Sequence, residues 1–247
     1  MVESSILKTD QFELQVIGSG AGASSIYDGL TSSSFMLLCN GSPFCLIDLG
    51  LGVGREVIKA FGRFPSNIII THNHSDHAGD LPVVLRVELA RNHRCRVFGH
   101  AEVVQRLKQH RVAEHIQQLS ADELADWQPA LTGQPLALAH ELTIEFYPGV
   151  HSEASYGFVI RNSQQHPLLS YTGDSQLEAD LYQAIVEADV FILDARPQAN
   201  PWHASFDEVK PWLKPGGYIL GHGLTDQQAK IDYVSWPLLL SSQRISF

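Results

Sequence analysis

The ten-residue stretch 71–80, THNHSDHAGD, contains three histidines and two aspartates. It directly follows three isoleucines, an apolar β-branched run that is typical of a buried strand. Four metal-binding side chains fall within six positions of this stretch: His72, His74, Asp76 and His77. Burying four such groups without a bound cation would be costly, and zinc accepts both imidazole and carboxylate ligands. The stretch therefore predicts a metal site in a loop just past the end of a buried strand.

Four ligands do not fill two metal sites, so a dinuclear site needs further ligands from other loops. Histidines at positions i and i+2 can aim two imidazoles at one point, and the next two ligands can serve a second metal a few ångströms away. Three more candidates each follow a predicted strand: His151, Asp174 and His222. Because strand-end loops at one edge of a sheet converge, these distant residues are expected to meet.

The pattern along the chain predicts antiparallel hairpins first, and then helices alternating with strands. Expected strands cover residues 12–18, 34–40, 43–50, 66–71, 95–99, 142–149, 156–162, 167–173, 189–195 and 216–222. Expected helices cover 53–64, 80–92, 100–112, 177–188 and 206–214, the last broken at Pro211. SGAGAS (19–24) is interpreted as a glycine-rich turn, and 113–136 as a surface helix and loop with a capping box at 120–123. This order favours a layered α/β architecture in one domain, residues 1–247.

Composition excludes several classes of function. The formal net charge is −10, from 17 Lys and Arg against 27 Asp and Glu, which argues against binding along a nucleic-acid backbone. The three cysteines stand in apolar contexts without CxxC spacing, so we expect buried free thiols in a reducing compartment. We see no signal peptide and no apolar run near the ~20 residues of a membrane helix. A cytoplasmic protein without a membrane partner is therefore expected.

The HxHxDH string, His151, the TGD motif and His222 occur in the order that is found in the metallo-β-lactamase fold superfamily, which residues 12–225 resemble. The resemblance implies an αββα four-layer sandwich of two mixed sheets with outer helices, with the metals at one edge between the sheets. It implies two divalent ions, one held by His72, His74 and His151, the other by Asp76, His77 and His222, with Asp174 bridging them. A hydroxide shared by the ions would be the nucleophile.

The resemblance leaves the metal open, with zinc as the first candidate and manganese or iron as alternatives. Asp48, in the LIDLG motif, matches an aspartate that orients metal-binding histidines in this fold. Taken alone, an aspartate before a glycine at a strand end is equally typical of a turn.

Further motifs resemble the ribonuclease Z-like branch, which contains tRNA 3′-processing enzymes and small phosphodiesterases. IGSGAG is followed by FCLIDLG and GDLP, and the branch's acidic residue and HxS histidine correspond to Asp194 and His203. The resemblance implies that His203 protonates the leaving alkoxide or steadies the phosphate, that Asp194 holds its tautomer, and that Asp76 also takes part in catalysis. Only 22 residues separate His151 from Asp174, which leaves no room for a basic tRNA-clamping arm.

These observations predict a metal-dependent hydrolase, specifically a phosphodiesterase that acts on a small or cyclic phosphodiester. Lactonases and glyoxalase II-like thioesterases share the ligand set and are the main alternative, although they generally lack the HxS motif. A non-catalytic metabolite-binding protein fits the intact ligand set less well. The expected partner is a small anionic substrate and not tRNA. A homodimer is a further candidate, because the apolar segment 236–247 can form an interface or add an edge strand.

Overall fold

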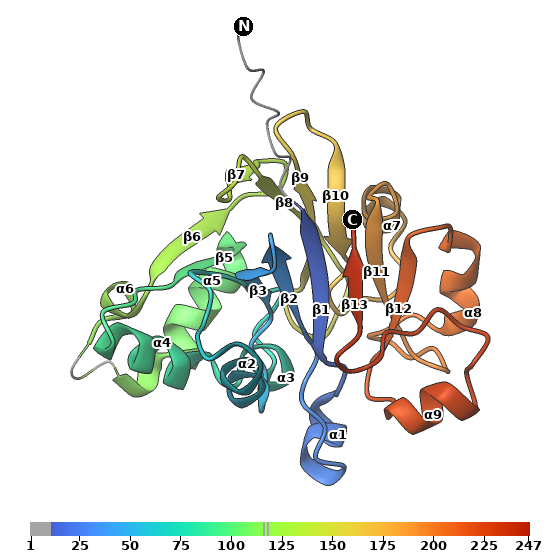
Figure 1. Cartoon of the computed structure of the whole chain (residues 1–247), viewed down its shortest axis with the longest axis horizontal. Coiled ribbons are helices and arrows are strands. Elements are labelled where there is room, and N and C mark those ends of the chain that lie inside the picture. Colours follow the sequence, from blue (N-terminus) through green and yellow to red (C-terminus); the bar gives the residue numbers. More distant parts are fainter. Residues whose placement is uncertain (1–10, 116, 118) are drawn as a thin grey trace, which may run out of the picture.

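The computed structural model describes residues 11–115, 117 and 119–247, which form two mixed β-sheets flanked by helices (Figure 1). This confirms the predicted αββα fold class. Residues 1–10, 116 and 118 of the predicted domain 1–247 lie outside the described residues.

The first sheet contains seven strands in the described chain, in the order β13-β1-β2-β3-β4-β5-β6. They span Arg244–Ser246, Phe12–Gly18, Ser34–Cys39, Ser42–Ile47, Asn67–Ile69, Arg96–His100 and Asp126–Ala130. The strands from β13 to β3 pair antiparallel, and those from β3 to β6 pair in parallel. Asn40 and Gly41 connect β2 to β3 with φ angles of 50° and 75°. An Asn-Gly pair readily adopts this left-handed backbone, which matches the twist of a tight hairpin.

The second sheet has the order β12-β11-β10-β9-β8-β7 among the described residues. Its strands span Gly217–Gly221, Val190–Ala195, Pro167–Tyr171, Tyr156–Arg161, Thr143–Pro148 and Leu136–Ala137. The predicted hairpin of β9 and β10 is present, and β10, β11 and β12 run in parallel. The carboxyl ends of these three strands therefore lie at one edge of the sheet.

Helices accompany each sheet, and apolar side chains fill the space between the sheets. Figure 1 shows α2 (Val53–Phe61), α4 (Leu81–Ala90) and α5 (Ala101–Arg106) beside the first sheet, and α7 (Ala179–Ile185) and α8 (Phe206–Val209) beside the second. Phe35 of β2 and Tyr171 of β10 meet edge to face, with ring centroids 5.4 Å apart. Both rings are fully buried, and their contact joins the two sheets in one core.

The structure departs from the sequence-based expectations at two places in the first half of the chain. Residues Gly22–Tyr27 of the expected turn region form a short helix, α1, which projects beyond the end of β1 (Figure 1). The segment 113–136 contains α6 (Ala121–Leu124) with the predicted capping box, but it also contributes the unpredicted strand β6. Pro129 and weak apolar alternation hide this strand in the sequence, and an edge strand with a single neighbour tolerates the proline.

A smaller departure concerns the helix expected over 100–112, whereas the break at Pro211 and the edge strand in the C-terminal segment agree with the expectations. The helix expected over 100–112 changes to a π-helix at Leu107–Arg111, and α8 gives way to a 3-10 turn at Lys210–Trp212, around Pro211. The C-terminal segment forms β13 at the edge of the first sheet, and α9 (Asp226–Ile231) precedes it. None of the helices in the described part combines the length and the apolar character needed to cross a membrane.

Candidate metal centre

Loops that follow β4, β8, β10 and β12 bring all seven predicted metal ligands together. The loop after β4 carries the first two histidines and continues into the short helix α3 (Ser75–Ala78), which carries the next two ligands. Ligand atoms lie within 4.8 Å of one another in four groups: His72, His74 and His151; Asp76, His77 and His222; His72, His77 and Asp174; and Asp174, Asp194, His203 and His222. The separate sequence motifs therefore meet in one cluster.

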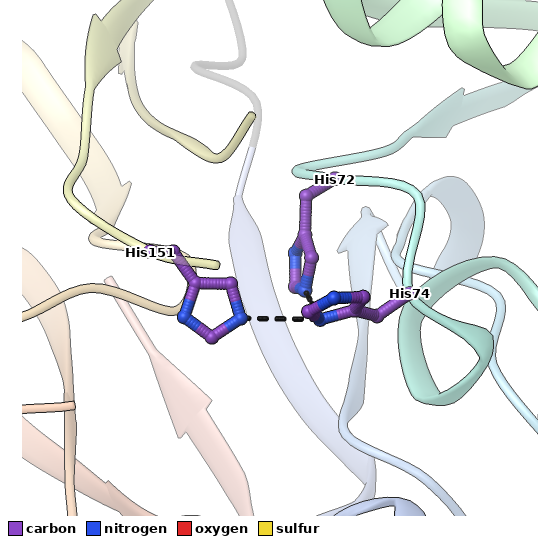
Figure 2. Close-up of side chains that lie close together, drawn as sticks. All are labelled: His72, His74 and His151. Carbon is purple, nitrogen blue, oxygen red and sulfur yellow. Dashed lines mark hydrogen bonds between the residues drawn. The ribbon is translucent and has the colours of Figure 1, made fainter. Parts of the chain in front are cut away.

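Three histidines in this cluster point their ring nitrogens at a common place (Figure 2). His74 Nδ1 lies 3.1 Å from His72 Nε2 and also 3.1 Å from His151 Nε2. Burial lowers the pKa of all three imidazoles, most strongly that of His72, so the neutral form with a free lone pair is favoured. His151 Nδ1 lies 3.0 Å from the carbonyl oxygen of Trp202, to which it can donate while Nε2 remains an acceptor.

In the group of Asp76, His77 and His222, the carboxylate of Asp48 holds the His77 ring in place. His77 Nδ1 donates to Asp48 Oδ2 at 2.7 Å, and the Thr71 backbone N–H donates to Asp48 Oδ1 at 2.8 Å. Burial alone would lower the pKa of His77, but Asp174 and Asp48 outweigh it and raise the pKa to about 10. His222 Nε2 lies 3.5 Å from Asp76 Oδ2 on the other side of the group. His77 Nε2 thus faces the centre of the cluster while Nδ1 faces Asp48.

Asp174 lies between the two groups and turns one oxygen toward each. Its Oδ1 is 3.3 Å from His77 Nε2 and 3.1 Å from His222 Nδ1. Its Oδ2 is 3.9 Å from His72 Nε2 and 4.0 Å from His151 Nε2. Burial raises the pKa of this carboxyl, but the two nearer histidines more than offset this and hold the pKa well below its usual range. An ionised carboxylate thus stands at the position predicted for a bridging ligand.

Three buried atoms at the centre make no hydrogen bond within the described part of the chain: His77 Nε2, Asp174 Oδ1 and His222 Nε2. A buried polar atom without a partner is costly and needs an explanation. These atoms belong to a set of imidazole and carboxylate groups, which zinc, manganese and iron all accept. The residues therefore fit a bound divalent cation.

Asp194 and His203 form a pair at the border of the cluster. His203 Nδ1 lies 2.6 Å from Asp194 Oδ2 and 4.0 Å from Asp174 Oδ2. Arg196 Nη2 donates to His203 Nε2 at 3.0 Å, so Nε2 accepts and the Nδ1 proton is donated to Asp194. Burial and the nearby Asp174 raise the pKa of Asp194, yet hydrogen bonds from His203 and His222 leave it below its usual value.

Two residues that support this site, Gly50 and Arg111, are not predicted by the sequence patterns. A Cβ atom on Gly50 would lie 1.9 Å from the backbone oxygen of Asp76, so only glycine lets the segment after β3 pass α3. Arg111, at the end of the π-helix, binds the metal loop through Nε to Asn73 Oδ1 at 3.1 Å and Nη1 to Ser75 Oγ at 3.3 Å. The LIDLG motif, which ends at Gly50, could have indicated the first residue. Nothing in the sequence around Arg111 indicates its contact with the metal loop.

Three solved structures share this fold over nearly the whole chain. YhfI from Bacillus subtilis, a metallo-β-lactamase fold protein, has a TM-score of 0.75 at 19% identity and covers 97% of this chain and 100% of its own. Zn²⁺-bound PqqB from Methylobacterium extorquens has a TM-score of 0.71 at 12% identity, covering 95% and 100%. The short form of human tRNase Z has a TM-score of 0.69 at 18% identity, covering 94% and 98%. The class is thus that of metallo-β-lactamase fold proteins, as predicted.

Sequence comparison narrows the class to a family. Residues 12–214 match the family model described as anti-Pycsar protein Apyc1, and the chain belongs to this family. A curated ribonuclease Z from Lactiplantibacillus plantarum (strain ATCC BAA-793 / NCIMB 8826 / WCFS1) is 32% identical over 75 residues, or 30% of this chain. The match spans only 24% of that ribonuclease Z. The predicted resemblance to the ribonuclease Z-like branch is therefore confirmed.

Proposed function

We propose that this protein is a metal-dependent phosphodiesterase that hydrolyses a small or cyclic phosphodiester. The observation that carries the proposal is the Asp194–His203 pair, joined at 2.6 Å and placed 4.0 Å from Asp174 at the border of the ligand cluster. The resemblance to the ribonuclease Z-like branch implies such a pair, and lactonases and thioesterases of the same fold generally lack the HxS motif. Similarity to ribonuclease Z and to tRNase Z supports this choice.

Two divalent ions, zinc first among them, are part of the proposal. His72, His74 and His151 would hold one ion and Asp76, His77 and His222 the other, with Asp174 between them. Bound divalent ions supply Lewis acidity and lower the pKa of water. Asp48 would contribute by holding the Nδ1 proton of His77, so that Nε2 is the nitrogen that gives up its proton and offers its lone pair when a cation binds.

His203 is proposed to act on the leaving group or on the phosphate. Its Nε2 currently accepts a hydrogen bond from Arg196, so a proton-donor role requires this bond to be replaced when substrate enters. Asp194 would keep Nδ1 protonated and stabilise the charged ring once Nε2 carries a proton. A carboxylate that orients a histidine in this way favours proton transfer to an alkoxide.

A small substrate suits the charge of the molecule better than a nucleic acid. The chain carries 17 Lys and Arg against 27 Asp and Glu, whereas a polynucleotide needs a line of cationic contacts. A single phosphodiester group needs only local positive charge, which a metal centre provides. The similarity to tRNase Z shows the fold, and the short segment between His151 and Asp174 supports a smaller substrate.

Element analysis of the purified protein, followed by parallel hydrolysis assays, tests the proposal. The substrates are bis-p-nitrophenyl phosphate, a 3′,5′-cyclic nucleotide, a lactone and a thioester. We expect turnover of the phosphodiesters that is removed by a chelator and restored by a divalent metal. Efficient cleavage of the lactone or thioester with no cleavage of either phosphodiester would assign the protein to the alternative class of hydrolase.

A further inference from the structure

Two cavities border the ligand cluster, and they differ in the charge that they offer an anion. One, of about 410 Å³, borders His151 and contains Glu102, Arg106, Glu153 and Tyr156. The other, of about 310 Å³, borders His222 and lies between α1 and the residues that follow β11. Either could receive the organic part of a substrate whose phosphate lies at the metal centre. The arginines around the site distinguish them.

Two of these arginines are already engaged. Arg106, in the larger cavity, lies 3.1 Å from Glu102 and 2.9 Å from Glu153, so two carboxylates neutralise it. Arg111 directs all three of its nitrogens at the metal loop, to Asn73 and Ser75. Neither guanidinium is available to a substrate without breaking contacts that the fold itself uses.

Arg196 differs from both because its guanidinium has an N–H group without a hydrogen-bond acceptor in the described chain. Its Nη2 donates to His203 Nε2, but Nε is buried and has no acceptor within the described chain. No carboxylate among the described residues lies within 4.0 Å of this guanidinium. The backbone is firmly held, since Arg196 N donates to Ala204 O and Phe206 N donates to Arg196 O, both at 2.9 Å. A buried donor without an acceptor indicates a partner that the chain does not supply.

The smaller cavity next to Arg196 has the chemistry to hold an organic group. Tyr27 of α1 contributes an exposed aromatic ring, and Asp28 contributes a carboxylate that can accept hydrogen bonds. Ala21 and Ala23 leave space between them and His222. An aromatic face beside an acceptor suits a heterocycle with amino or hydroxyl groups, because such rings stack on aromatic side chains.

We infer that Arg196 is the substrate-binding residue for the phosphodiester and that the cavity between α1 and Arg196 receives an attached nucleoside or similar aromatic group. This inference rests on the proposed function and specifies how the same site selects its substrate. The guanidinium presents a planar fork to two phosphate oxygens, which a lysine cannot do. Among the described residues that line the larger cavity, Arg106 is the only arginine or lysine, and Glu102 and Glu153 already pair with it.

Titration of inorganic phosphate into the metal-loaded protein tests Arg196 independently of turnover. Arg196→Met should weaken phosphate binding roughly ten- to a hundredfold, the range expected for hydrogen bonds to a charged group. Arg196→Lys keeps a charge and should weaken it less, while Arg106→Met, the matched control, should leave it unchanged. Metal content and melting temperature should equal those of the parent protein. Unchanged phosphate binding in Arg196→Met, equal loss in Arg106→Met, or loss of metal from both Arg196 variants would overturn the inference.

Kinetics with a cyclic nucleotide test the cavity. Arg196→Met and Tyr27→Ala should both raise KM, whereas Ile26→Ala, an exposed neighbour outside the cavity, should not. Tyr27→Ala should leave inorganic phosphate binding unchanged, because the ring contacts only the organic group. Equal KM values for Tyr27→Ala and Ile26→Ala would refute the cavity assignment. If the parent protein cleaves no phosphodiester but binds phosphate through Arg196, the proposed function fails while the anion site stands.

Discussion

His77 donates its Nδ1 proton to Asp48 Oδ2 at 2.7 Å, and both side chains are fully enclosed by the fold. An asparagine at position 48 could present its amide N–H to the same nitrogen. His77 would then lose the contact or move its proton to Nε2, which faces the cluster and must be unprotonated to bind a metal.

Asp48→Asn should therefore lower metal affinity roughly ten- to a hundredfold, as is typical when the partner of a ligating histidine is changed. Competition with a metallochromic chelator measures this change. Glu88→Gln is the matched control, because Glu88 holds His93 at 2.6 Å far from the centre. Equal metal affinities for Asp48→Asn and the parent protein would show that Asp48 only stabilises the turn after β3 and does not orient His77.

Asp174→Ala should remove both metals or leave one loosely bound, since each carboxylate oxygen faces a different group of histidines. Element analysis of the protein before and after dialysis against a chelator checks this result. A variant that keeps two tightly bound ions would show that Asp174 does not bridge. A parent protein with one ion at full activity would contradict the dinuclear site itself.

His203→Ala should lower phosphodiesterase kcat by roughly a hundred- to ten-thousandfold, the usual contribution of a general acid or base. Metal content should be preserved. His166→Ala removes a histidine that pairs with Asp189 at 2.8 Å on the exposed surface, and it should retain full activity. If His203→Ala retains parental turnover while His74→Ala is inactive, then His203 takes no part in the reaction.

The protein should neither process precursor tRNA nor bind it tightly. Two divalent ions would change the formal charge only from −10 to −6, and their charge would be confined to one site. Filter binding at physiological ionic strength, combined with a 3′-end cleavage assay, measures both properties. Submicromolar binding with cleavage would overturn this prediction, and size-exclusion chromatography would then show whether a dimer supplies a basic surface.

The buried thiols should make the folded protein less stable at high pH. Burial, with a smaller contribution from Glu88, raises the pKa of Cys95 from 9.0 to about 12, and burial raises that of Cys45 further. Between these values the unfolded chain loses protons that the folded chain keeps, so the free energy of unfolding falls as pH rises above about 9. Urea unfolding at pH 8 and pH 10 measures the slope. Cysteine labelling at pH 9 should be slow until the protein unfolds, and rapid labelling of Cys95 in folded protein would contradict the prediction.

Sequence patterns were informative where the chemistry is local. The hairpin of β9 and β10 follows from two apolar runs and a polar turn, and the cluster at 72–77 is dense enough to predict a metal site. SGAGAS, however, is typical of a turn, although in the structure Ser24 Oγ accepts from the Ala21 backbone N–H at 2.8 Å at the start of α1. A serine in so glycine-rich a segment does not reveal that bond.

Long-range contacts account for what the sequence did not predict. β6 forms because β5 offers it a backbone edge, and its side chains carry little of that information. Arg111 acts through partners that the fold brings near from 36–38 residues away along the chain. The seven candidate ligands could be predicted from the sequence because closely spaced histidines and aspartates are typical of metal sites. An arginine on an amphipathic helix, in contrast, looks like any solvent-exposed cation.

The pairing of β1 with β13 has a consequence for the order in which the molecule is built. On the ribosome, Leu14 of β1 emerges long before its partner Ile245 of β13. The outer edge of β1 therefore remains unpaired while the rest of the sheet assembles, and its closure joins segments more than 200 residues apart. Unpaired edges are templates for association with other chains. The emergence of β13 thus ends the period in which this edge of β1 is open to other chains.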